Sequence, residues 1–124
     1  MVDASVLATA LGDDGDDGDT ARERLRGEEL AAPEIIDLEA TSVWRRTLTD
    51  ERRAARALAD LADLPLKRAP HLPLLPRCWE LRHNLTPYDA AYVALAEALD
   101  VAFVTADRRL SRAAGIRCAV DVLS

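Results

Sequence analysis

Val101-Ala102-Phe103-Val104-Thr105-Ala106-Asp107 is a run of apolar residues that leads into a carboxylate. Its first five residues predict a strand, and their apolar character indicates that this strand lies centrally in a sheet. Helices are predicted on both sides of the run, because residues 88–99 have an apolar face and residues 107–114 end at Gly115. The run therefore indicates an α/β fold in which Asp107 lies at the carboxyl end of a buried strand.

Strands and helices alternate along the whole chain. Strands are predicted at residues 1–2, 30–32, 64–69, 101–105 and 116–122, and helices at residues 5–11, 20–26, 34–48, 51–61, 72–85, 88–99 and 107–114. Asp19 is the expected N-cap of the second helix, because the Gly/Asp segment 12–18 is not expected to continue a helix. Strands separated by helices pair in parallel through right-handed crossovers. We therefore expect a three-layer α/β/α sandwich with a central, mostly parallel sheet, in a single domain over residues 1–124.

The composition is that of a globular protein that folds in water. Of 124 residues, 49% are hydrophobic and 31% are charged, and no apolar run approaches the ~20 residues needed to cross a bilayer. We expect no signal peptide, because no basic segment precedes a long apolar stretch at the N-terminus. Cys78 and Cys118 lack the CxxC spacing of zinc sites, and reduced cysteines favour a cytoplasmic protein without a membrane partner.

Charge is unevenly distributed along the chain. The net charge of −6 argues by itself against a nucleic-acid partner. Aspartates are concentrated in residues 13–19, however, while arginines recur in adjacent pairs at 45–46, 52–53 and 108–109. Arg108, Arg109 and Arg112 follow Asp107 closely and could contact the phosphates of a nucleic acid. Ordinary arginines on solvated helix faces explain each pair equally well.

Four acidic residues occupy positions where α/β proteins commonly have a site: Asp3, Glu39, Asp89 and Asp107. Asp3 and Asp107 follow predicted strands, and ligands of open parallel sheets bind at that edge. Glu39 lies in an apolar helical segment, where an unpaired carboxylate is unfavourable, and Asp89 lies in the first turn of the apolar helix 88–99. Carboxylates that gather repel one another unless a cation such as Mg²⁺ or Mn²⁺ binds them. The pattern favours a metal-dependent enzyme that acts on phosphate esters.

Each of these acids also has a purely structural explanation. Asp3 and Asp107 can cap the helices that follow them, and Asp89 is typical of the first turn of a capped helix. Glu39 can lie at the edge of its helix's apolar face with the carboxylate in water. Ser5 can hydrogen-bond a carboxylate or simply stabilise the turn after Asp3. Spacing alone leaves both explanations open, because it does not show whether the four residues converge.

Several motifs together resemble those of the PIN-domain ribonucleases, and more closely those of the VapC-type toxins of prokaryotic toxin–antitoxin pairs. The motifs are Val2-Asp3-Ala4-Ser5-Val6-Leu7, the helix that carries Glu39, Leu85-Thr86-Pro87-Tyr88-Asp89-Ala90-Ala91-Tyr92-Val93-Ala94-Leu95-Ala96, and Val104-Thr105-Ala106-Asp107-Arg108-Arg109-Leu110. They follow the order and approximate spacing of that family from the first residue to about Leu110. The segment between Glu39 and Leu64 is more compact than the family pattern.

The resemblance implies a function and a set of roles. Asp3, Glu39, Asp89 and Asp107 would bind one or two Mg²⁺ or Mn²⁺ ions, while Ser5 and Thr105 match the hydroxyl residues that accompany the first and last acids. The family implies hydrolysis of RNA, commonly tRNA or rRNA. It also implies a cognate antitoxin whose tail covers the site, and homodimers that assemble with that antitoxin.

Two other functions compete with a ribonuclease. In the first, the chain is a non-catalytic PIN-like module that docks a protein partner, and its acids are only helix caps. In the second, it is a phosphoacceptor or phosphatase domain. The second is disfavoured because Asp3-Ala4-Ser5 is not the acid pair of such phosphatases, and because Lys67 is the only lysine in the chain.

Overall fold

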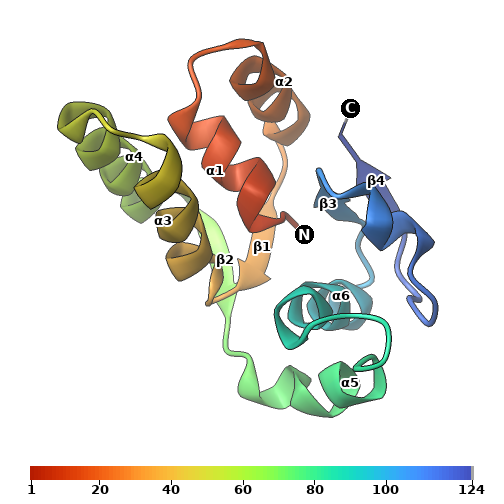
Figure 1. Cartoon of the computed structure of the whole chain (residues 1–124). Helices are drawn as coiled ribbons and strands as arrows, with labels where there is room; N and C mark the ends of the chain where they lie inside the picture. The colour runs from red at the N-terminus through yellow and green to blue at the C-terminus, as the bar shows by residue number, and fades with distance from the viewer. Residues whose placement is uncertain (124) are drawn as a thin grey trace.

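The structure is a computed structural model that describes residues 1–123 (Figure 1). In chain order its elements are α1 (Ala4–Gly12), α2 (Asp16–Leu25), β1 (Leu30–Pro33), α3 (Ile36–Thr47), α4 (Glu51–Asp63), β2 (Leu66–Ala69), the 3₁₀ helix η1 (Leu72–Leu74), α5 (Leu75–Glu80), α6 (Pro87–Leu99), β3 (Phe103–Thr105), the 3₁₀ helix η2 (Arg108–Arg112) and β4 (Val120–Val122). Helices α4 and α6 are 13 residues long. Within the described residues, no helix has both the length and the apolar character needed to cross a membrane.

The first three residues join two pairs of parallel strands. Strand β1 pairs with β2 and strand β3 pairs with β4, both in parallel. Between the pairs, the amide of Val2 donates to the Ala31 carbonyl at 3.2 Å, and the amide of Asp3 donates to the Val104 carbonyl at 2.9 Å. The spatial order is therefore β2, β1, residues 1–3, β3 and β4. This arrangement confirms the predicted mostly parallel sheet and puts Asp3 at its centre.

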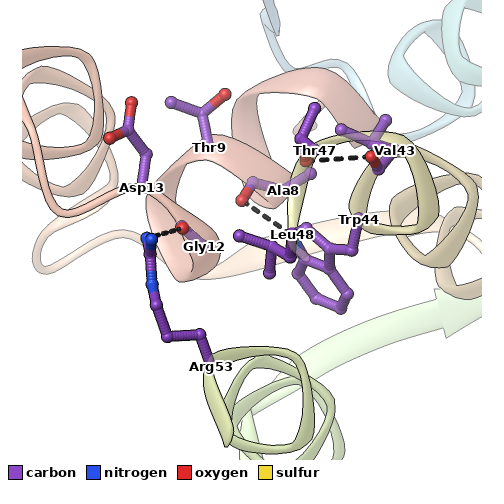
Figure 2. Close-up of a pocket in the computed structure, with 9 residues that line it drawn as sticks. All are labelled: Ala8, Thr9, Gly12, Asp13, Val43, Trp44, Thr47, Leu48 and Arg53. Atoms are coloured by element: carbon purple, nitrogen blue, oxygen red, sulfur yellow. Dashed lines mark hydrogen bonds between the residues drawn. The ribbon is translucent and has the colours of Figure 1, made fainter. Parts of the chain in front are cut away.

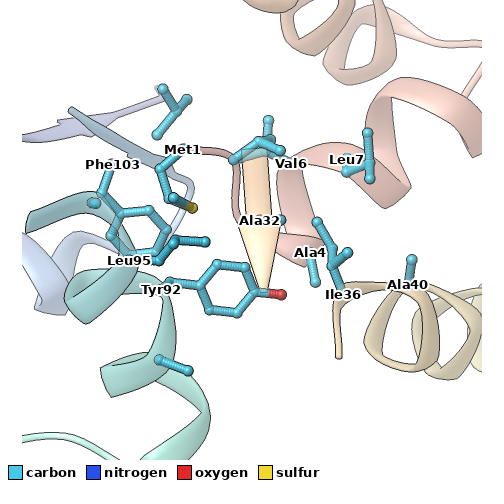
Figure 3. Packing of buried hydrophobic residues seen from close by; sticks show 14 of the residues in the cluster. Met1, Ala4, Val6, Leu7, Ala32, Ile36, Ala40, Tyr92, Leu95 and Phe103 are labelled. Carbon is cyan, nitrogen blue, oxygen red and sulfur yellow. The ribbon is translucent and has the colours of Figure 1, made fainter. Parts of the chain in front are cut away.

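Helices cover both faces of this sheet (Figure 1). Helix α1 packs against α2, α3 and α4 on one side, while α6 contacts β1 and β3 on the other side, with α5 against it. The core between α6 and the strands contains the rings of Tyr92 and Phe103, which stack with their centroids 5.6 Å apart (Figure 3). Met1 and Ala32 are buried in the same cluster. The predicted three-layer α/β arrangement is confirmed.

The second helix begins earlier than predicted, at Asp16 rather than after Asp19. Its N-cap is Gly15, which makes no side-chain cap bond, and its first turn contains Asp16, Asp17 and Asp19. The helix dipole stabilises negative charges at this end of the helix. The sequence prediction did not take this stabilisation into account. Gly18 lies inside the helix, and a Cβ at that position would collide with the Asp13 backbone carbonyl, so the close approach requires glycine. The expectation that the segment 12–18 would not continue a helix is correct for residues 13–15, which separate α1 from α2, and wrong for residues 16–18.

Two further helices are shorter than predicted. The segment 72–85 forms only η1 and α5, and residues 81–84 are turns. Pro73 and Pro76 each lie at the start of one of these short helices, where a missing amide is tolerated. The segment 107–114 forms the five-residue helix η2. Strands β3 and β4 are likewise shorter than the predicted segments 101–105 and 116–122.

Helix α1 approaches α3 closely at Gly12 (Figure 2). The indole Nε1 of Trp44 donates to the carbonyl oxygen of Ala8 at 3.0 Å, and Arg53 of α4 donates to the carbonyl oxygen of Gly12 at 2.8 Å. The Arg53 bond satisfies a carbonyl at the end of α1 that lacks a partner within the helix, and the Trp44 bond ties α3 to α1. A cavity of about 270 Å³ lies at this junction, lined mainly by these residues and by Val43, Thr47 and Leu48. None of the four predicted acids lines it.

We expect Gly12→Ala to destabilise the protein. A Cβ at Gly12 would lie 2.6 Å from Nε1 of Trp44, which its hydrogen bond holds in place. Overpacking of this kind lowers the free energy of unfolding by about 1–3 kcal/mol, measurable by urea denaturation. The matched control is Gly15→Ala, whose Cβ would meet only the Asp13 carboxylate, at 3.2 Å, and should change stability by less than about 1 kcal/mol. Equal losses in both variants would contradict this account.

Candidate active site at the rim of the sheet

The buried hydroxyl of Thr105 connects the first and last predicted acids. Thr105 is fully buried at the end of β3, and its Oγ1 donates to Oδ2 of Asp3 at 2.6 Å. The same Oγ1 accepts a hydrogen bond from the backbone amide of Asp107 at 3.1 Å. Asp3 and Asp107 therefore share one edge of the sheet, as the sequence predicted.

Asp3 is also the N-cap of α1. Its Oδ1 accepts hydrogen bonds from the amide of Ser5 at 2.8 Å and from the Ser5 hydroxyl at 3.1 Å. The capping explanation of Asp3 is therefore correct in structural terms. It does not exclude a second role, since a carboxylate has about four acceptor positions and these contacts, with Thr105, use three.

Glu39 is brought to the same region by α3. It is partly buried, and its Oε1 accepts a hydrogen bond of 2.7 Å from the hydroxyl of Tyr92 on α6. Figure 3 shows this hydroxyl at the end of the ring that points away from Phe103, toward Ala4 and Ile36. Glu39 therefore does not lie at the edge of its helix with the carboxylate free in water, which was the structural alternative.

Asp89 lies in the first turn of α6 and is partly buried. Its backbone amide donates to Oγ1 of the N-cap residue Thr86 at 3.2 Å, as the sequence predicted for a capped helix start. The capping bond uses the backbone of Asp89, so its carboxylate remains available for other contacts. Tyr92 follows one helical turn later, on the same face of α6.

The four acids lie close enough for their charges to affect pKa values within the group. Burial raises the pKa of Glu39, and the negative charges of Asp3 and Asp89 raise it further, against the Tyr92 hydrogen bond. Burial likewise raises the pKa of Asp89, with smaller contributions from Asp3 and Asp107. Burial and the contact with Glu39 raise the pKa of Tyr92 as well, so its hydroxyl remains a hydrogen-bond donor. The fold thus gathers four carboxylates that were far apart in sequence.

Asp107 differs from the other acids because it has a cationic partner. Arg109 donates to both carboxylate oxygens, with Nη2 2.7 Å from Oδ2 and Nε 3.1 Å from Oδ1. The Arg109 guanidinium lowers the pKa of Asp107 and also acts on Asp89, whose pKa it lowers slightly against the other contributions. Asp107 also caps η2, since it accepts from the Arg109 amide at 3.0 Å.

The four carboxylates are the kind of ligand that a hard divalent cation prefers, but they are not already arranged around a single metal position. All four are carboxylates, and their mutual repulsion is what such a cation would remove. Among residues 1–123, however, no three His, Cys, Asp or Glu side chains are already arranged to hold a metal ion. The hydrogen bonds above explain this spacing, because Asp3 is held by Ser5 and Thr105, Glu39 by Tyr92, and Asp107 by Arg109.

The three arginines predicted to contact RNA lie on η2 beside Asp107. All three are exposed, and only Arg109 has an acidic partner among the described residues. Two contacts among the candidate site residues were missed by the sequence analysis. One is the hydrogen bond of Tyr92 to Glu39, which the spacing of Asp89 and Tyr92 on one helix face could have suggested. The other is the pairing of Arg109 with Asp107 instead of a phosphate.

Comparison with known proteins gives consistent matches. A family model described as the PIN domain matches residues 1–116. Ribonuclease VapC9 of Mycobacterium tuberculosis is 42% identical over 127 residues, which cover 99% of this chain and 97% of that protein. Ribonuclease VapC1 of the same species is 41% identical over 128 residues, covering 99% and 96%. Ribonuclease VapC12, also from M. tuberculosis, is 33% identical over 111 residues, covering 86% of each chain.

We expect Tyr92→Phe to destabilise the protein while it preserves the stacking on Phe103. The change removes the donor from the partly buried carboxylate of Glu39. Loss of one hydrogen bond to a charged group lowers the free energy of unfolding by about 1–2 kcal/mol, measurable by urea denaturation. Tyr88→Phe is the matched control, because Tyr88 is 57% exposed. A Tyr92→Phe protein as stable as the Tyr88→Phe protein would contradict the role given to this hydroxyl.

Glu39 and Asp89 should make the metal-free protein more stable as the pH is lowered from neutral, against an opposing contribution from the Met1 amino group, whose pKa is lowered in the folded protein. The pKa values of Glu39 and Asp89 are raised in the folded protein, so between their unfolded and folded values the folded state binds more protons. Stability then rises as pH falls through that window. Asp107 does not oppose this trend, because its lowered pKa acts below the ordinary carboxyl range.

Thermal melts in chelator from about pH 7.5 to about pH 5 measure this effect around the ordinary carboxyl range. The double variant Glu39→Gln/Asp89→Asn should show a smaller rise than the wild type. Asp60→Asn, a change at an exposed position of α4, serves as the control and should leave the rise unaltered. Parallel pH profiles for the wild type and the double variant would refute the mutual repulsion.

Proposed function

This chain belongs to the PIN-domain family, and from that premise we propose that it is a Mg²⁺- or Mn²⁺-dependent endoribonuclease, the toxin of a type II toxin–antitoxin pair. The reaction is hydrolysis of RNA phosphodiester bonds. The observation that carries the proposal is the gathering of Asp3, Glu39, Asp89 and Asp107 within reach of one another's charge. Such a group is unfavourable for folding alone and is the donor set that a divalent cation requires.

Asp3, Asp89 and Asp107 would hold the cation, and Glu39 would hold a second ion or orient the attacking water. A bound divalent cation lowers the pKa of water and stabilises negative charge on phosphoryl oxygens. Thr105 keeps Asp3 at the rim through its buried hydroxyl, and Tyr92 fixes Oε1 of Glu39. Because Tyr92 holds only one oxygen of Glu39, the second oxygen can accept a proton or a water hydrogen bond.

RNA is the proposed substrate because the relatives above are named ribonucleases. Exposed arginines beside Asp107 support it, since Arg108 and Arg112 have no acidic partner among residues 1–123 and can contact phosphates. A tRNA or an rRNA is the expected target. A cognate antitoxin, a homodimeric assembly and a cytoplasmic location complete the proposal, and the resemblance to VapC-type toxins supports all three.

A non-catalytic PIN-like docking module is the second candidate. It is favoured by the capping bonds of Asp3 and Asp107 and by the position of Asp89 in a first turn, which account for three acids without any chemistry. It is weaker for Glu39, which lies in the first turn of α3 but caps no helix, is partly buried, and has its pKa raised by the charges of Asp3 and Asp89. Saturable binding of Mn²⁺ separates the candidates, because a docking module has no need of it.

Asp89→Asn should abolish most RNA cleavage. The amide removes a proposed ligand, while the capping bond from the backbone amide to Thr86 is unaffected. We expect cleavage to fall by more than about 100-fold, because even residues that only support metal ligands typically account for ~10–100-fold. The assay uses purified protein and a labelled total RNA pool, with Mn²⁺ or with chelator.

Asp60→Asn is the matched control, since it makes the same chemical change at an exposed position away from the acids. Thermal melts with and without Mn²⁺ show whether each variant is folded and still stabilised by the ion. An Asp89→Asn protein that cleaves RNA at the wild-type rate would remove Asp89 from the site. Cleavage that persists unchanged in chelator would exclude the metal mechanism.

A further inference from the structure

We propose that Arg109 is an exchangeable counter-ion of the acidic site: it neutralises Asp107 in the metal-free protein and leaves it when a divalent cation binds. This inference rests on the proposed function, because it requires the carboxylates to bind a cation. It assigns to Arg109 a role that a phosphate-binding arginine does not have. Binding of the metal ion would thus also release the Arg109 guanidinium, which could then bind a phosphate.

The contact between the two side chains has the geometry of strong, specific pairing. Two nitrogens of the guanidinium face two oxygens of the carboxylate, at 2.7 Å and 3.1 Å. Paired forks of this kind are the strongest form of arginine–carboxylate contact. Together with the Arg109 amide, the guanidinium occupies the acceptor positions of Asp107 that a metal ion would need. A cation and Arg109 therefore compete for the same oxygens.

The pair is built so that the exchange is possible. The Arg109 side chain is 87% exposed, whereas that of Asp107 is 29% exposed. When the pair opens, the guanidinium moves into water, which solvates its charge, so the exchange leaves no buried arginine without a partner. Asp107 is held in place by the amide that it caps and by its own amide bond to Thr105. The carboxylate stays at the rim while its partner leaves.

Electrostatics favour replacement of one cation by another at this position. Arg109 partly offsets the charge of Asp89 as well as that of Asp107. Its single positive charge is shared by a site with four carboxylates, so a divalent ion neutralises more of their repulsion. Once that ion is bound, it repels the guanidinium. Arg109 is then free beside Arg108, where a phosphate of bound RNA is the natural partner.

Mn²⁺ titration of three proteins tests this exchange. Isothermal calorimetry compares the wild type, Arg109→Gln and Arg108→Gln, all without RNA. Removal of Arg109 eliminates the competitor, so we expect Mn²⁺ to bind more tightly by a factor on the order of 5–10. Arg108→Gln removes the same charge from the neighbouring exposed residue, which has no carboxylate partner among residues 1–123, and should change affinity by less than about twofold.

Nuclear magnetic resonance of the Arg109 side chain follows the release directly. The Nε–Hε signal, identified by its absence in Arg109→Gln, should move during a Mg²⁺ titration toward the position of unpaired arginines. Its midpoint should equal that of Mg²⁺ binding. A signal that stays unchanged while Mg²⁺ saturates the protein overturns the exchange.

The outcomes distinguish this inference from the proposed function. If the wild type binds no Mn²⁺ saturably, both fail. If it binds Mn²⁺ but Arg109→Gln and Arg108→Gln shift the affinity equally, the metal site stands and the counter-ion role of Arg109 is wrong. Thermal melts in chelator check that both variants are folded, which is expected because both side chains are exposed.

Discussion

The hydroxyl of Thr105 lies between two acids from opposite ends of the chain, donating to the side chain of Asp3 and accepting from the amide of Asp107. This contact exists because residues 1–3 run parallel to β3, with the amide of Asp3 bonded to Val104. Since Thr105 is fully buried, its hydroxyl must be satisfied within the protein. One parallel pairing thus places two acids at one rim, and α3 and α6 bring Glu39 and Asp89 to them.

Gathering four carboxylates opposes folding, and the structure offsets this in a different way for three of them. Asp3 accepts from Ser5 and Thr105, Glu39 accepts from Tyr92, and Asp107 pairs with Arg109. The pKa values of Glu39 and Asp89 nevertheless remain raised, first by burial and then by the charges of the neighbouring carboxylates. Under the proposed function, a bound cation would relieve the remaining repulsion and stabilise the folded protein. Helix capping and ligand chemistry are therefore compatible explanations of the same side chains.

Predictions from the sequence succeeded where local signals were unambiguous. Helices α4 and α6 begin at Glu51 and Pro87, within one residue of the predicted starts, and β1 begins at Leu30 as predicted. Predictions failed where local propensity was overridden by a tertiary contact. Gly18 fits within α2 beside the Asp13 carbonyl where a larger residue would collide, and the segment after α5 turns at residues 81–84 to lead into α6. Glycine is therefore a reliable sign of a helix end only where no close approach of a neighbouring backbone requires glycine inside the helix.

The sequence by itself determined the alternation of strands and helices, and with it the parallel sheet and the position of Asp3 and Asp107 at strand ends. These features follow from periodicity and from residue preferences within short segments. Only the tertiary structure decided that Glu39 faces Tyr92 and that Arg109 pairs with Asp107. The first contact depends on how two helices from distant segments pack across a core, and the second on a side-chain torsion. The spacing of these residues along the chain predicts neither contact, because each depends on the distance between side-chain atoms in the folded protein.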